Sequence, residues 1–155
     1  MNPLIKRLAA RAGVRLDADR WADNKKVPQY NGQTVACDGL TDSEILHEIA
    51  HFVVSPDAYR FKPNFGLGSG FLGGYARRLV PEEEAEEQEH DASALGIAFE
   101  RALGLDWEAT VFEHNWRLRD LEEHLEALQR RGFLDVDCFP FLLKDDPHED
   151  QAGRA

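Results

Sequence analysis

Residues 41–54 have the sequence TDSEILHEIAHFVV, and this stretch decides how the rest of the chain is interpreted. Thr41 and Glu44 form a capping-box pattern, in which both side chains accept hydrogen bonds from free backbone N–H groups at the start of a helix. The apolar residues that follow predict a buried helix. It should end before Pro56, because the residue preceding a proline disfavours the helical conformation.

The predicted helix carries the motif His47-Glu48-Ile49-Ala50-His51. Residues four apart lie on the same helix face, so both imidazoles can reach one metal ion. Glu48 lies beside that face and can take a proton from a metal-bound water, whose pKa zinc lowers to about 7. The motif predicts one divalent ion bound by His47 and His51, with Glu48 as general base. The alternative is a chance match on a structural helix.

A catalytic site of this kind needs a third protein ligand, and the acidic stretch 82–91 offers several. Glu89 is favoured because it lies close to the apolar side of the helix predicted there. The small residues Ala92 and Ser93 follow it and let this helix approach the HExxH helix closely. We therefore expect His47, His51 and Glu89 to be the metal ligands.

Other carboxylates stay open as the third ligand. Glu87, with Asp91 four residues later to orient it, is the main competitor, and Glu86 lies one turn before Glu89. Asp57 is less favoured, because Val54 stands where short-spaced zinc sites need a glycine, and a β-branched residue resists the sharp turn.

The rest of the chain is mostly helical by pattern. A short strand near Val35 stands between turn signals, and no clear period appears between residues 17 and 29. We expect a small α+β domain, mostly helical and zincin-like, with a short sheet flanking the HExxH helix. The predicted elements are helices over 3–12, 81–103 and 107–131 and one strand over 33–38.

The length of 155 residues suits one core. We predict a single metal-binding domain over 1–144 and an acidic, disordered tail over 145–155. Lys and Arg number 18 against 29 Asp and Glu, a net charge of −11, which disfavours binding to nucleic acid or anionic membranes. No apolar run approaches the roughly 20 residues of a membrane span, and no secretory signal is evident. A cytoplasmic location is expected.

Several further residues admit a functional and a structural interpretation. The glycine-rich stretch 66–74 is a connection that can serve as a lid, and the aromatic residues around it can line a substrate groove or pack it down. His114 can stabilise an oxyanion or be an ordinary surface or core histidine. We expect Asp91 or Ser93 to accept a hydrogen bond from a ligand histidine, and His90 to face solvent or to support a ligand.

Two further groups of residues are expected to be structural. The aromatic residues at helical spacing, Trp107, Phe112 and Trp116, should belong to the core. Cys37 and Cys138 should be buried thiols.

Two family resemblances follow from these motifs. The strand, the capped HExxH helix and the later glutamate resemble the small Glu-zincin cores of ImmA/IrrE-type metallopeptidase domains. Residues 89–96, EHDASALG, are similar to that family's E-x-x-A-[N/D]-x-[F/L]-A pattern and depart from it at Ser93 and Gly96. Residues 27–52 resemble the bacterial elongation factor P hydroxylases, a likeness that covers about 27–104. The second resemblance implies a non-haem iron site built on the same two histidines and glutamate.

The expected function is a metal-dependent hydrolase, similar to a metallopeptidase, that acts on a peptide or protein. Zinc is the favoured ion and Fe(II) the alternative, because a site with two histidines and one carboxylate suits both. The alternatives are a non-haem iron protein hydroxylase and a catalytically silent, metal-stabilised interaction module. The sequence does not determine the oligomeric state.

Overall fold

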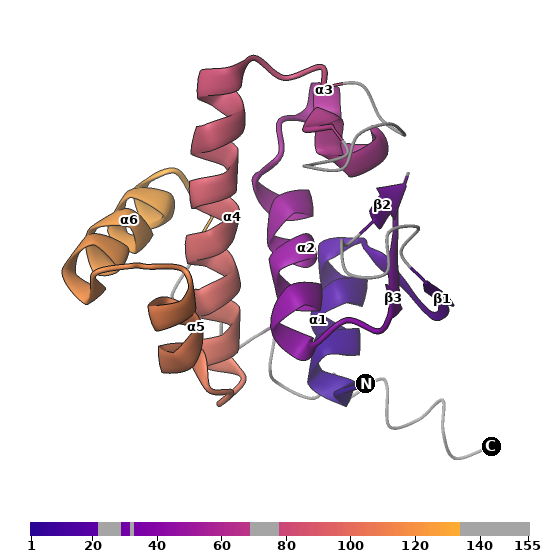
Figure 1. The fold of residues 1–155 in the computed structure, drawn as a ribbon, viewed down its shortest axis with the longest axis horizontal. Helices are drawn as coiled ribbons and strands as arrows, with labels where there is room; N and C mark the ends of the chain where they lie inside the picture. Colours follow the sequence, from indigo (N-terminus) through magenta and orange to yellow (C-terminus); the bar gives the residue numbers. More distant parts are fainter. Residues whose placement is uncertain (22–28, 32, 69–77, 134–155) are drawn as a thin grey trace.

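The computed structural model describes residues 1–21, 29–31, 33–68 and 78–133 (Figure 1). The helices in these ranges are α1 (Pro3–Ala12), α2 (Asp42–Val54), α3 (Asp57–Arg60), the 3₁₀ helix η1 (Pro63–Gly66), α4 (Glu82–Ala102), α5 (Trp107–Glu113) and α6 (Leu118–Arg130). The strands are β1 (Arg15–Trp21), β2 (Gln29–Asn31) and β3 (Thr34–Asp38). The α+β prediction is confirmed: the described chain is mostly helical with one short sheet.

The sheet has the strand order β1-β3-β2. β3 lies in its centre, parallel to β1 and antiparallel to β2, and Val35 pairs with Leu16 on one side and Tyr30 on the other. β3 confirms the strand predicted over 33–38, and its Cys37 is buried as expected. β1 and β2 were not predicted. β1 is polar in sequence, and backbone pairing with β3, rather than an apolar period, forms it.

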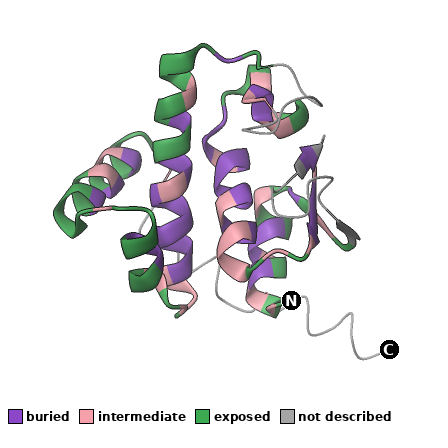
Figure 2. Ribbon diagram, viewed as in Figure 1, coloured by how far each residue is buried: buried purple, intermediate pink, exposed green. Residues whose placement is uncertain are grey.

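α2 confirms the predicted helix. The Glu44 backbone N–H donates to Thr41 Oγ1 at 3.2 Å, and the Thr41 N–H donates to Glu44 Oε2 at 2.7 Å, so both bonds of the capping box form. Figure 1 shows α2 between α4 on one side and the sheet on the other. Most residues of α2 are accordingly buried (Figure 2).

α4 runs alongside α2 in the opposite direction (Figure 1). A Cβ atom added at Gly96 would lie 3.3 Å from the Cα of His47, a tighter approach than most side chains tolerate. Ala92, Leu95 and Gly96 are all buried on α4. The predicted helix over 81–103 is confirmed, with Pro81 as the residue just before its first turn.

The single helix predicted over 107–131 is wrong, because the structure divides it into α5 and α6. Asn115 takes the left-handed conformation, with φ at 57°. The Asn115 N–H donates to the Phe112 carbonyl at 3.1 Å and the Trp116 N–H to the Val111 carbonyl at 3.0 Å, a pattern that ends a helix.

One of the aromatic residues expected in the core, Phe112, lies outside it. Phe112, in the short helix α5, is 84% exposed. Trp107 and Trp116 are partly buried and pack against the core. The apolar face of α6, formed by Leu121, Leu125 and Leu128, is buried in the same hydrophobic cluster as α2 and α4.

Parts of the sequence predictions lie outside the described residues: Cys138, the tail over 145–155 and positions 69–74 of the glycine-rich stretch. Among the residues that are described, no helix is both long and apolar enough to cross a membrane.

Candidate metal centre

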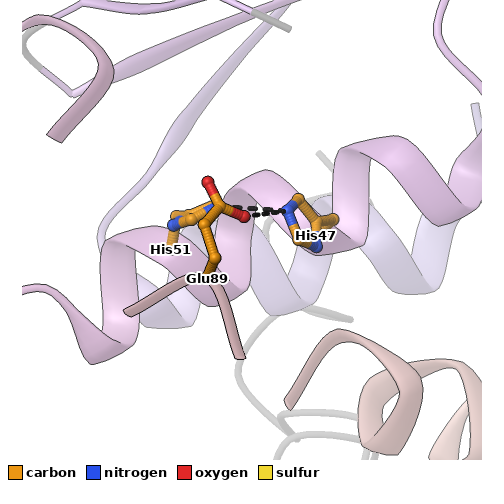
Figure 3. A group of neighbouring side chains, drawn as sticks. All are labelled: His47, His51 and Glu89. Atoms are coloured by element: carbon orange, nitrogen blue, oxygen red, sulfur yellow. Dashed lines mark hydrogen bonds and ion pairs between the residues drawn. The ribbon is translucent and has the colours of Figure 1, made fainter. Parts of the chain in front are cut away.

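Three side chains from two helices meet beside the α2–α4 contact (Figure 3). The Nε2 atoms of His47 and His51 lie 3.0 Å apart. Glu89 Oε2 lies 3.5 Å from the first of these nitrogens and 3.2 Å from the second. The ligand atoms lie within 4.8 Å of one another, so the structure brings together the three residues that the sequence analysis favoured.

The spacing of these donor atoms fits a small divalent ion. Zinc binds imidazole nitrogen and carboxylate oxygen at about 2.0–2.2 Å, and tetrahedral geometry then places neighbouring donors about 3.3–3.5 Å apart. The observed separations of 3.0, 3.2 and 3.5 Å match that spacing to within a few tenths of an ångström. Two imidazoles and one carboxylate are also a common donor set for zinc and for Fe(II).

His51 is held by stacked aromatic rings. Its side chain is 4% exposed, and its ring lies 5.3 Å from that of Phe65 with 16° between the planes. Phe65 stacks in turn on Tyr30, at 4.0 Å and 16°. Within the described chain His51 Nδ1 is buried and has no hydrogen-bond partner. On the Nδ1 side, ring packing rather than a hydrogen bond from these residues therefore orients this imidazole.

The segment that carries Phe65 has an unusual backbone. Asn64 and Phe65 have φ values of 46° and 56°, in the left-handed region that few residues other than glycine adopt. Asn64 stabilises this conformation, because its Oδ1 accepts from the Tyr30 N–H and its Nδ2 donates to the Gly68 carbonyl, both at 3.2 Å. This strained turn places Phe65 against His51.

Glu48, the residue between the two histidines that the sequence analysis singled out as a general base, is buried. It lies on α2 next to His47 and is 7% exposed. Burial raises the pKa of Glu48 to about 7; the charge of His47 acts to lower it, and those of Glu89 and Glu44 to raise it. A carboxyl group with a pKa in this range can accept and release a proton at neutral pH.

The pKa of Glu89 is shifted the other way. Burial acts to raise it, but hydrogen bonds from His47 and His51 and their charges outweigh burial and hold it below the ordinary value. Glu89 is therefore ionised at neutral pH, the state that binding of a metal ion by a carboxylate requires.

The competing carboxylates lie elsewhere. Glu86 and Glu87 are exposed and are not among the clustered donors. The Asp57 side chain is 91% exposed and pairs with Arg60. Asp91 does not reach a ligand histidine, contrary to one expectation: its two oxygens lie 2.8 Å from His124 Nε2 and 2.8 Å from Arg131 Nη1, which tie α4 to α6.

His114 and Ser93 border the site on the side of α5. The His114 ring lies 6.2 Å from that of His47, at 89°. Ser93 does not bond a ligand histidine either: its Oγ lies 3.0 Å from His114 Nδ1 and accepts from Trp116 Nε1 at 2.9 Å. Burial and the nearby charge of His47 lower the pKa of His114, which favours its neutral form. His90 is exposed, as one of the two interpretations had it.

A pocket of about 330 Å³ adjoins the centre, and Glu89 forms part of its wall. Two of the described residues that line it are Leu67, directly after η1, and Arg78, before α4. The others lie in the first half of α4: Glu82, Ala85, Glu86, Glu89 and His90. It leaves open space next to the Glu89 side chain.

Sequence reasoning did not find the roles of Phe65 and Gly96. Phe65 was one of several aromatic residues near the glycines, and nothing in the pattern linked it to His51. Gly96 carried a usable signal, since a glycine in the middle of a helix often marks a close approach of another backbone.

Comparison of the chain with protein-family models, with curated proteins and with solved structures gave no significant match. The resemblances to the ImmA/IrrE-type domains and to the elongation factor P hydroxylases therefore stay predictions.

Proposed function

We propose that the chain is a zincin-like, metal-dependent hydrolase that acts on a peptide or protein. His47, His51 and Glu89 would hold one divalent ion, with zinc favoured, and Glu48 would be the general base. The observation that carries the proposal is the convergence of these three donor atoms within 4.8 Å beside a buried glutamate. The spacing of the HExxH motif places the two histidines together, but it does not require Glu89, which is on a different helix, to lie beside them.

Each residue has a separate task in this proposal. When bound, the ion would polarise a substrate carbonyl and lower the pKa of a water molecule. Glu48 accepts the proton of the attacking water and passes it to the leaving amine, a role that suits a carboxyl group with a pKa near 7. The pocket beside Glu89 receives a substrate side chain.

Metal titration of purified variants tests the ligand set. His47→Ala, His51→Ala and Glu89→Gln should each weaken zinc binding by about 100-fold or more, because each removes a bond to the ion. Glu87→Gln and Glu86→Gln are matched controls on the same helix, and both should bind zinc like the wild type. A large loss for Glu87→Gln beside a mild one for Glu89→Gln would contradict the proposed third ligand.

Reconstitution of the metal-free protein tests the reaction. The protein loaded with zinc, or anaerobically with Fe(II), is incubated with a pool of peptides, and the products are identified by mass spectrometry. The proposal expects cleaved peptides with zinc and none with zinc-loaded Glu48→Gln, which should keep its metal. Products that gain one oxygen atom, formed only with Fe(II) and O₂, would contradict hydrolysis and support the hydroxylase.

A further inference from the structure

We propose that His114 is a substrate-binding residue of the candidate metal centre. Trp116 and Ser93 hold its ring in the tautomer whose Nε2–H donates a hydrogen bond to a substrate oxygen. This inference rests on the proposed function and adds to it a residue that binds the substrate rather than the ion.

The placement of His114 supports a contact with substrate. It is exposed, it meets the ring of His47 edge to face at 6.2 Å, and it is not among the clustered donor atoms. Ser93, its partner, lies one helical turn after Glu89 on α4. The His114 ring therefore lies next to the donor group without belonging to it, where a molecule bound at the ion would pass.

The hydrogen bonds at Ser93 favour one of the two neutral forms of the His114 ring. The indole Nε1 of Trp116 can only donate, so it occupies a lone pair of Ser93 Oγ at 2.9 Å. The hydroxyl proton of Ser93 needs an acceptor, and within the described chain its remaining side-chain partner is His114 Nδ1 at 3.0 Å. When Nδ1 accepts, the neutral ring carries its proton on Nε2. The opposite tautomer would leave the partly buried hydroxyl proton without an acceptor in these residues.

The backbone break between α5 and α6 makes this arrangement possible. His114 and Trp116 flank Asn115, whose φ is 57°. Backbone hydrogen bonds to the carbonyls of Thr110, Phe112 and Val111 hold the turn. In a continuous helix, residues 114 and 116 would be rotated by about 200° around the axis, so their side chains would lie on nearly opposite faces and could not both contact Ser93. The turn thus brings both rings to Ser93.

The chemistry suits a developing negative charge. A fixed neutral N–H donor beside the ion stabilises charge on a substrate oxygen without having to change its own protonation state. Ser93 and Trp116 do not touch the substrate in this account and act as positioning residues.

The tautomer is measured first, and the measurement needs neither substrate nor metal. Long-range ¹H–¹⁵N correlation spectra of the imidazole nitrogens are recorded at pH 8, where a histidine of ordinary pKa is neutral; the signals of His114 are assigned by their loss in His114→Gln. The wild type should show a protonated Nε2 and an unprotonated Nδ1. Ser93→Ala should give a mixture of tautomers, and Ser93→Thr, which keeps the hydroxyl, should restore the wild-type spectrum. A protonated Nδ1 in the wild type would overturn the proposal.

Ligand binding is measured second, with acetohydroxamate as the probe and the cobalt-substituted protein as its optical reporter. His114→Ala should weaken acetohydroxamate binding by about 10-fold, the loss of one hydrogen bond, while cobalt affinity stays within twofold. Phe112→Ala, an exposed change in the same turn, is the control and should leave both affinities unchanged. Equal acetohydroxamate affinity in His114→Ala and wild type would overturn the role of His114. Failure of the wild type to bind cobalt would instead contradict the proposed function.

Discussion

The two histidines of the HExxH motif have different surroundings, although they lie one turn apart. The His51 side chain is 4% exposed beneath Phe65, whereas that of His47 is 24% exposed and faces His114. His51 is thus oriented by packing from the side of the sheet. His47 lies on the more open side of the centre.

Replacing Phe65 tests the first of these environments. Phe65→Leu removes the ring that stacks on His51, so the imidazole gains rotational freedom and zinc affinity should fall by about 5- to 10-fold. Phe61→Leu is the matched control, because Phe61 is 53% exposed and its ring contacts Phe52 rather than a ligand. Titration with a competing chelator, well below the unfolding temperature, measures both. An unchanged affinity in Phe65→Leu would show that other contacts orient His51.

Glu48 gives a prediction for the pH dependence of stability in the metal-free protein. Burial raises its pKa from 4.5 to about 7, so between these values the folded state keeps a proton that the unfolded state has lost. The stability that protonated Glu48 contributes to the wild-type protein is therefore lost as the pH rises from about 4.5 to about 7. Glu48→Gln carries no such charge, so relative to wild type its free energy of unfolding should rise by about 2–3 kcal/mol between pH 4.5 and 8.

Urea unfolding in the presence of a chelator measures this difference. Glu87→Gln, an exposed change, is the control and should keep a constant difference from wild type over the same range. A constant difference for Glu48→Gln as well would mean that the Glu48 carboxylate is solvated in the folded protein.

The contact between α2 and α4 determines whether the ligands meet. Glu89, Ala92 and Gly96 follow one another at intervals of three and four residues, so they lie along one face of α4. Ala92 is fully buried, and Gly96 leaves space for the backbone at His47. The glutamate reaches the histidines because the residues that follow it are small.

Gly96→Ala tests this contact. The added Cβ would lie 3.3 Å from the His47 Cα, so the helices must separate by a few tenths of an ångström. Alanine should stabilise an isolated helix by about 1 kcal/mol over glycine, yet zinc affinity should fall by about 10-fold. Ala92→Leu should have a similar effect without removing a ligand. Wild-type zinc affinity in both variants would show that the donor atoms do not depend on this packing.

The sequence predicted the elements that carry strong local signals and missed those that depend on distant partners. The capping box and the apolar run were sufficient for α2, and Pro81 with the acidic first turn indicated α4. β1 was missed because its sequence is polar and shows no apolar alternation; it forms a strand because its backbone pairs with β3. The break at Asn115 was missed because an asparagine is also tolerated within helices, and only the turn's hydrogen bonds reveal the left-handed conformation.

For the molecule as a whole, the candidate centre joins two parts of the chain. The histidines come from α2, which continues from the sheet, and the glutamate comes from α4, which packs on α5 and α6. Residues 55–81 separate the two helices in sequence. An ion that bonds both helices would bind the folded state and not the unfolded chain, and it would therefore stabilise the fold.

Thermal unfolding with and without zinc tests this coupling. At a free zinc concentration of about 100 times Kd, binding adds about 2.7 kcal/mol, which corresponds to a rise in Tm of roughly 5–10 °C for a chain of this size. Glu89→Gln should lose most of the rise and Glu87→Gln should keep it. Equal Tm values for the wild type with zinc and with a chelator would contradict metal binding to the folded state.

The spacing of the donor atoms has a consequence for which ions compete for the centre in a living cell. The centre has two nitrogen donors, and its donor atoms lie 3.0–3.5 Å apart. This arrangement disfavours Ca²⁺, which takes six to eight oxygen ligands at about 2.3–2.6 Å. It offers no comparable discrimination among Fe²⁺, Co²⁺, Ni²⁺, Cu²⁺ and Zn²⁺, whose intrinsic affinities follow a fixed order that peaks at copper. The cellular supply of each ion would then decide occupancy. Metal content after purification would report the growth medium, whereas turnover after reloading with each ion identifies the physiological one.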